Sequence, residues 1–153
     1  MKKLATGIVS AGLLTMMILP IQANNTAVSY SQSSSYVLSI PDTIELNSAS
    51  SKSLAIGVQN VNTTPEQKVQ VKASGLTNGK VTLTRASKGD TIQVTVSKSE
   101  NGSGISDTDV LAEFQDQSTT AVSGGTIWFA AVGNVPAGTY SGTITFTGSY
   151  ANR

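Results

Sequence analysis

The chain contains no histidine and no cysteine. Without histidine, the common Ser-His-Asp and Cys-His catalytic arrangements and histidine-based zinc sites are excluded. Without cysteine, no disulfide framework supports the fold. The nucleophile motifs S-x-x-K and G-x-S-x-G are also absent from the sequence. We therefore expect a protein that is not an enzyme and that uses no cofactor.

Charged residues are scarce, at 12% of the chain. If the first 23 residues are removed, two of the ten basic residues are lost and none of the nine acidic ones, so the net charge becomes (10 − 2) − 9 = −1. This balance offers no basic surface for nucleic acid or for an anionic membrane. The abundant Ser, Thr, Asn and Gly predict a hydroxyl- and amide-rich surface, which suits a fibre, a coat or a secreted matrix.

The N-terminus has the three parts of a secretory signal peptide. Lys2 and Lys3 precede a weakly apolar stretch, residues 4–19, and Ala23 provides a small residue for cleavage. An uncleaved membrane anchor is the alternative, but the stretch is short for a bilayer. We expect a signal peptide over residues 1–23 and a secreted protein, extracellular or at the cell surface. No later stretch is long and apolar enough to span a membrane, so no membrane contact is expected after cleavage.

Residues 24–35 (NNTAVSYSQSSS) are polar and rich in serine, which predicts a flexible N-terminal arm. Val28 and Tyr30 have the same parity as Tyr36 in the alternating run that follows. Because alternate residues of a strand share one face, the arm could extend a strand if an acceptor groove were present. Val28 and Tyr30 are therefore candidates for strand exchange with another subunit.

Short alternating runs with turns between them fill residues 36–153 and predict about eight or nine strands. The expected fold is all-β, an antiparallel two-sheet sandwich of immunoglobulin-like type, and a barrel is the structural alternative. Val110–Phe114 fits a strand or one helical turn, and we favour a strand. Further expectations are a short strand at Ile44 and Leu46, a hairpin at Asn78-Gly79, a turn at Lys88–Asp90 and a loop over Ser118–Gly125.

The strongest pattern is at the end of the chain. From Tyr140 to Tyr150, apolar residues and glycine alternate with serine and threonine, which predicts one long strand. Val135–Gly138 (VPAG) has good β-turn chemistry, with proline at the second position and glycine at the fourth. We expect residues 126–132 to pair with the long strand as a hairpin across this turn. Most of the aromatic residues in this region are expected in the core.

Trp128 is the only tryptophan in the chain. If Ile127 and Phe129 face the core, Trp128 faces away from it and becomes a candidate for ligand binding or for a subunit contact. The alternative is a strand covered on both faces, with the indole in a structural role. Asp107 and Asp109 follow a loop and are the best metal candidates, but their spacing does not fit an EF-hand, so no metal site is expected.

A resemblance to known proteins rests on two runs. PAGTYSGTITFTGSY, residues 136–150, looks like the closing strand of secreted bacterial β-sandwich proteins, among them fimbrial-type subunits and spore-coat-like domains. SYVLSIPDTIEL, residues 35–46, is similar to the opening strands of small exported immunoglobulin-like domains. The resemblance implies an extracellular structural or adhesive subunit, and it assigns no binding residue to a numbered position.

Two functions follow as expectations. The first is a secreted, non-enzymatic structural or adhesive subunit of a surface or matrix, fimbrial-like, which associates with itself or with related subunits. The alternative is an extracellular module that binds carbohydrate or a host surface, with a surface glycan or protein as its partner. Nucleic acid is not expected as a partner in either case.

Overall fold

The computed structural model describes residues 27–115 and 117–153. The expected signal peptide, residues 1–23, and the first residues of the arm lie outside this range. The described chain falls into two units, with the boundary between Ser31 and Gln32. In the first unit, Val28 and Tyr30 are almost fully exposed. The described residues of the arm up to Ser34 form neither helix nor strand.

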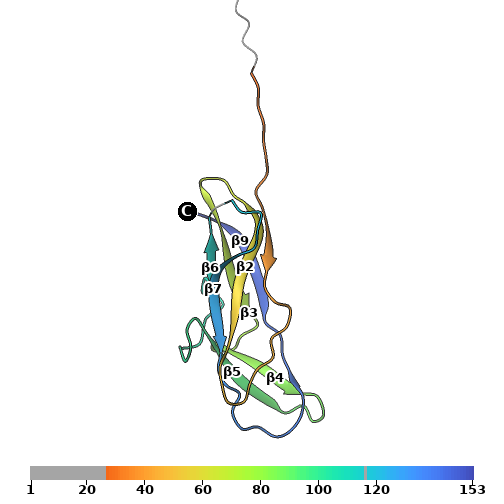
Figure 1. Cartoon of the computed structure of the whole chain (residues 1–153). Coiled ribbons are helices and arrows are strands. Elements are labelled where there is room, and N and C mark those ends of the chain that lie inside the picture. The colour runs from red at the N-terminus through yellow and green to blue at the C-terminus, as the bar shows by residue number, and fades with distance from the viewer. Residues whose placement is uncertain (1–26, 116) are drawn as a thin grey trace, which may run out of the picture. The chain divides into compact units, whose positions relative to one another are not determined.

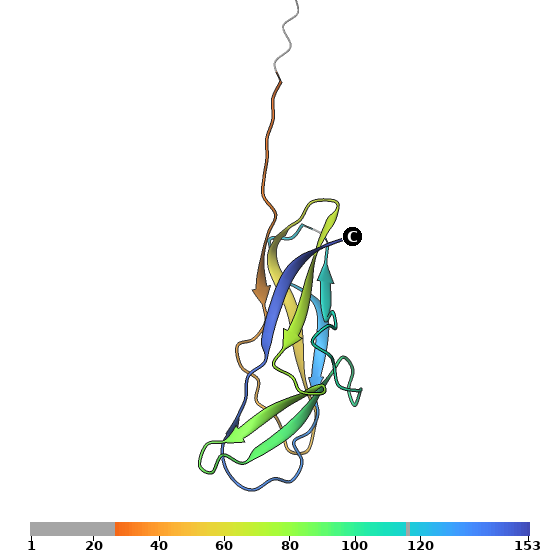
Figure 2. The ribbon, with the colours of Figure 1, turned by 180° about the vertical axis from the view of Figure 1, so that it is seen from behind.

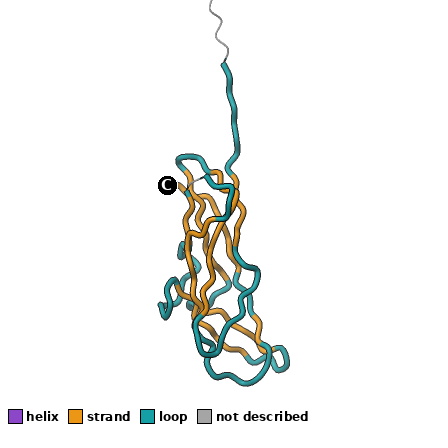
Figure 3. The backbone as a smooth tube through the Cα atoms, viewed as in Figure 1, coloured by secondary structure: helices purple, strands orange, loops and turns teal. Residues whose placement is uncertain are grey.

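The described residues form nine strands and no helix. Figure 3 shows strand and loop segments along this part of the chain. The strands are β1 (Ser35–Ser39), β2 (Lys52–Asn62), β3 (Gln67–Ser74), β4 (Lys80–Arg85), β5 (Thr91–Ser97), β6 (Ala112–Phe114), β7 (Val122–Phe129), β8 (Tyr140–Ser141) and β9 (Thr145–Asn152). This part of the chain therefore holds no helix that is long and apolar enough to cross a membrane. The all-β prediction is confirmed, and β6 confirms a strand in place of a helical turn.

All strand pairs are antiparallel, and they make two sheets (Figure 1). The larger sheet has the order β1-β2-β7-β5-β4-β8, and the smaller has the order β6-β3-β9. The hairpin of β4 and β5 joins the rest of the larger sheet through only two residue pairs between β5 and β7. Seen from behind in Figure 2, this hairpin forms one end of the second unit, beyond the ends of β3 and β9.

The hydrophobic core lies between the two sheets and draws on both. Ile56 and Val58 of β2 are fully buried, as are Val69 and Val71 of β3 and Ile127 of β7. In β3 and β7 the buried residues alternate with more exposed ones, because successive side chains of a strand point to opposite faces, whereas in β2 Gly57 is buried as well, next to a shift in register. Burial of each such side chain stabilises the fold by about 1.5–3 kcal/mol. The sequence periodicity thus identified the core residues of these strands.

The prediction for the end of the chain is wrong in two respects. The expected strand from Tyr140 to Tyr150 is broken into β8, which pairs with β4, and β9, which pairs with β3 in the other sheet. The expected hairpin with residues 126–132 does not form, because β7 pairs with β2 and β5. At Gly142 the chain passes so close to the carbonyl oxygen of Thr82 that a Cβ atom would lie 2.4 Å from it. The chain then crosses from one sheet to the other.

The turn at Asn78-Gly79 forms, but it does not make the expected hairpin. Both residues have positive φ, 52° and 74°, and Thr77 and Lys80 exchange backbone hydrogen bonds of 2.9 and 3.1 Å. Such a two-residue turn normally joins neighbouring strands of one sheet. Here β3 and β4 belong to different sheets, so the turn redirects the chain between layers.

Two further boundaries differ from the expectation. Ile44 and Leu46 are not in a strand; they lie in the loop between β1 and β2 and pack partly buried against the core. In the expected loop Ser118–Gly125, strand β7 already begins at Val122. The turn at Lys88–Asp90 is confirmed, since it joins the paired strands β4 and β5.

Arg85 fixes the β4–β5 hairpin to the loop that leads into β8. The side chain is 9% exposed, and its guanidinium donates to the carboxylate of Asp90 and, at 3.2 Å, to the carbonyl oxygen of Ala137. Gly138 packs directly against the aliphatic stem of Arg85, where a Cβ atom would lie 2.6 Å from Cδ. These contacts hold one wall of the crevice described below.

The β3–β6 pair carries an ion pair whose effect depends on pH. The ammonium of Lys68 lies 2.9 Å from Oε1 of Glu113, and the amide of Gln70 donates to the same oxygen at 2.7 Å. The hydrogen bond from Lys68, followed by that from Gln70, lowers the pKa of Glu113. Because a lowered carboxyl pKa stabilises the fold above the unfolded pKa, this contribution is lost as the pH falls through the folded pKa.

We predict that Glu113→Gln destabilises the protein at pH 7 and less, or not at all, at pH 3. The reason is that the wild-type carboxylate is neutralised at low pH and then resembles the amide. Urea unfolding of both proteins at the two pH values measures the difference in the free energy of unfolding. An equal difference at both pH values would contradict the prediction.

Candidate functional site

Strand β9 is one of the two edge strands of the smaller sheet, and β6 is the other. Strand β9 pairs with β3 along its whole length, from Ser74 opposite Thr145 to Gln67 opposite Asn152. No described strand pairs with the other side of β9. Half of the backbone N–H and C=O groups of such an edge point outward and can accept another strand. Natural edges are commonly protected by lysine or proline, and β9 (TFTGSYAN) contains neither.

At one end of β9, side chains of β1 pack against the strand. The rings of Tyr36 and Tyr150 pack edge to face, with centroids 5.1 Å apart. Gly148 lies beneath Tyr36, and a Cβ atom there would be 2.5 Å from the ring and 3.1 Å from Leu38. Partial burial raises the pKa of the Tyr150 phenol, and Tyr36 adds a smaller effect in the same direction. Tyr150 is 41% exposed, so it is less buried than expected.

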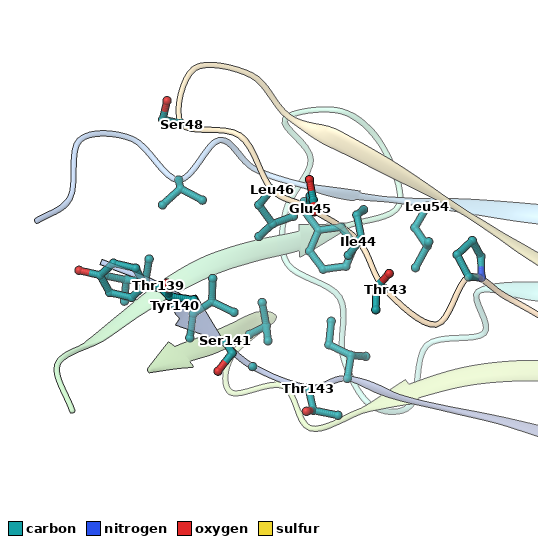
Figure 4. A pocket seen from close by; sticks show the side chains of 18 of the residues that line it. Thr43, Ile44, Glu45, Leu46, Ser48, Leu54, Thr139, Tyr140, Ser141 and Thr143 are labelled. Carbon is teal, nitrogen blue, oxygen red and sulfur yellow. The ribbon is translucent and has the colours of Figure 1, made fainter. Parts of the chain in front are cut away.

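Beyond this contact, a crevice of about 770 Å³ opens between two segments that are not paired with each other (Figure 4). One wall is the loop that follows β1, with Ile44 and Leu46. The other is the chain from Thr139 to Phe146, including β8 and the break before β9. A strand was expected at each wall. The first wall is a loop instead, and the strand of the second wall is interrupted between β8 and β9.

The floor of the crevice belongs to the hydrophobic core. Leu54, Val81 and Phe129 line it, and each is buried in the core. The rim is polar and includes Thr43 and Thr143. The apolar surface that a partner can cover comes from the partly buried residues of the walls, Ile44, Leu46 and Ile144. Its chemistry suits apolar side chains that alternate along an added strand, since hydroxyl groups flank an apolar floor.

The two candidate residues of the arm are exposed to solvent. Val28 is 92% exposed and Tyr30 is 86% exposed, within the unit that ends at Ser31. At the start of the second unit, the hydroxyl of Ser34 donates to the side-chain oxygen of Gln67 at 3.0 Å. The strand-exchange role of Val28 and Tyr30 stays a prediction.

Trp128 faces away from the core, as its parity predicts. Its neighbours Ile127 and Phe129 are buried between the sheets, with exposed fractions of 0% and 4%. Trp128 lies opposite Ser53 of β2 and Ser97 of β5 in the larger sheet. Trp128 is partly buried and lines a small pocket, and its contact with a ligand or a subunit stays a prediction.

Asp107 and Asp109 lie in the loop between β5 and β6. The carboxylate of Asp109 accepts a hydrogen bond from the backbone of Ser106 at 2.9 Å and lies 3.7 Å from the ammonium of Lys98. Within residues 27–115 and 117–153, no three or more His, Cys, Asp or Glu side chains form a group that could hold a metal ion. The local contacts of Asp109 account for its position in the turn.

Sequence reasoning missed the crevice because it expected a short strand at Ile44 and Leu46 and one unbroken strand from Tyr140 to Tyr150. Pro41 indicated that the first strand ends or bends there, and Gly142 was the signal left unused, since a glycine in a strand marks a close approach. Both residues line the crevice. No model of a known protein family matches the chain, and no curated protein matches it.

Proposed function

We propose that this protein is a secreted, non-enzymatic structural subunit that associates with copies of itself by strand addition. In this proposal, residues 24–33 of one copy pair with the outer edge of β9 in another, which completes an immunoglobulin-like sandwich. The observation that supports it most directly is the unpaired edge of β9 beside an open crevice with a core floor.

The arm is long enough for this role. An extended chain rises about 3.3 Å per residue, so residues 24–33 reach about 33 Å. Strand β9 has 8 residues and spans about 26 Å by the same rise. An arm that pairs only with the first half of β9, residues 145–148, therefore leaves about six residues that continue past Thr145, over the crevice.

The pattern of the arm fits the same geometry. Val28 and Tyr30 share one face of an extended chain, and Ser29 and Ser31 share the other. With Val28 and Tyr30 directed into the crevice, the two serines face solvent. Main-chain hydrogen bonds then provide most of the affinity, and the apolar side chains set the register.

We predict that the chain 24–153 forms assemblies that grow with concentration, whereas the chain 34–153 stays monomeric. The shorter chain keeps Ser34, its bond to Gln67 and all nine described strands. Size-exclusion chromatography with light scattering, over a wide concentration range, gives the mass of each.

A peptide of residues 24–33 provides the complementary test. It is expected to bind the chain 34–153 and to raise its melting temperature, because a ligand that binds only the folded state stabilises it. If both chains are monomeric at every concentration, or if both assemble equally, the proposal is refuted.

A further inference from the structure

We infer that the protein has a second binding site, for a single neutral sugar ring, on the outer face of the larger sheet around Trp128. The residues of this site differ from those of the crevice, so the inference does not depend on strand addition. The site is the Trp128 pocket, of about 250 Å³, and its lining residues are Ser51, Thr95, Ser97, Asn101, Gly102, Trp128 and Ala130.

Two neighbouring strands build the floor of the Trp128 pocket. Trp128 lies at the end of β7 and Ala130 just after it, and Thr95 and Ser97 come from β5. Ser97 lies directly opposite Trp128, and the backbone N–H of Ala130 donates to the carbonyl of Thr95 at 2.9 Å. The backbone that carries the indole is therefore fixed by the pairing of β7 with β5.

The loop after β5 forms a wall that is held in place by its own hydrogen bonds. The hydroxyl of Ser97 and the backbone N–H of Gly102 both donate to the carbonyl of Ser99, at 2.6 and 3.0 Å. A Cβ atom at Gly102 would lie 2.6 Å from the hydroxyl oxygen and 3.0 Å from the carbonyl oxygen of Ser99, so a larger residue there would displace the Ser99 side chain. A wall formed in advance lowers the entropic cost of binding.

The chemistry of the pocket combines an indole with hydroxyl and amide groups. A sugar ring has the complementary character, because its C–H face is apolar and its edge carries hydroxyls. Aromatic surfaces with a few placed polar groups are typical of small-molecule sites. The hydroxyl of Ser51 also donates to the carboxylate of Glu100 at the rim, and a carboxylate there disfavours an anionic ligand.

The size of the pocket limits the ligand to one ring. Sites for drug-sized ligands have volumes of about 300–1,000 Å³, and the Trp128 pocket is smaller at about 250 Å³. A terminal sugar of a glycan fits this description, with the rest of the glycan outside the pocket.

Because Trp128 is the only tryptophan, its fluorescence reports directly on this pocket. The probes are the methyl glycosides of glucose, galactose, mannose and N-acetylglucosamine, titrated into the chain 24–153. We expect at least one to shift or quench the emission with a dissociation constant of about 1–10 mM, a usual strength for a small, shallow contact. If no probe changes the emission at concentrations up to about 100 mM, any binding is too weak for a specific site, and the inference is overturned.

Two threonine variants test whether the sugar binds in the Trp128 pocket, and both retain Trp128, whose fluorescence is measured. Thr95→Val removes a hydroxyl that lines the pocket and is expected to weaken binding about 3- to 10-fold. Thr126→Val is the matched control, since Thr126 lies two residues before Trp128 on β7, is exposed and does not line the pocket. We expect its affinity to be unchanged. Equal effects of the two variants on affinity would overturn the assignment to this pocket.

Discussion

Replacing both Val28 and Tyr30 by aspartate is expected to leave the chain 24–153 monomeric at concentrations where the wild-type protein assembles. In the proposed contact these two side chains enter a crevice whose floor includes Leu54 and Phe129. Burial of a large apolar side chain contributes about 1.5–3 kcal/mol, and a charge in the same place adds a desolvation cost. Loss of about 4 kcal/mol weakens association roughly a thousand-fold.

The matched control is the double variant of Ser29 and Ser31 to aspartate. It introduces the same charge into the same segment, but on the opposite face of the extended arm. We expect this control to assemble with no more than about a tenfold loss of affinity, because its charges face solvent. Sedimentation velocity measures the mass distribution of both variants. Similar behaviour of the two would mean that charge alone, and not the face of the arm, decides the result.

Gly79→Ala is expected to destabilise the fold strongly, by about 2–4 kcal/mol. Gly79 has a φ of 74°, which an L-residue adopts only at a cost. In addition, a Cβ atom would lie 2.4 Å from Cα and 2.6 Å from the carbonyl carbon of Gly104. Both contacts are with backbone, so the loop that holds Gly104 against β5 has to move.

Gly89→Ala separates these two causes. Gly89 has the same φ of 74°, but nothing lies within 4 Å of a Cβ atom there. Gly89→Ala is therefore expected to lower the free energy of unfolding only by the cost of the positive φ, about 1 kcal/mol. Urea unfolding of the wild type and both variants gives the three free energies of unfolding. If Gly79→Ala costs no more than Gly89→Ala, the contact with Gly104 is not tight in solution.

The candidate sites show which features can be predicted from the sequence and which depend on the tertiary structure. The parity of Trp128 between Ile127 and Phe129 was enough to predict that the indole faces away from the core. The pocket around it was not predictable, because its wall comes from Asn101 and Gly102, which only the β5–β7 pairing brings beside Trp128. The crevice was missed because strands were expected at both of its walls, at Ile44 and Leu46 and from Tyr140 to Tyr150.

The sequence by itself determined the local properties of this protein: the all-β class, the turns at Asn78-Gly79 and Lys88–Asp90, and the buried face of each strand. These follow from alternation and from backbone preferences, which act between residues close in the chain. Only the tertiary structure decided which strands pair, that Tyr140 and Tyr150 belong to different sheets, and that one edge of β9 has no described partner. Alternation specifies the face that a side chain occupies but not the neighbouring strand, because pairing depends on packing between residues distant in sequence.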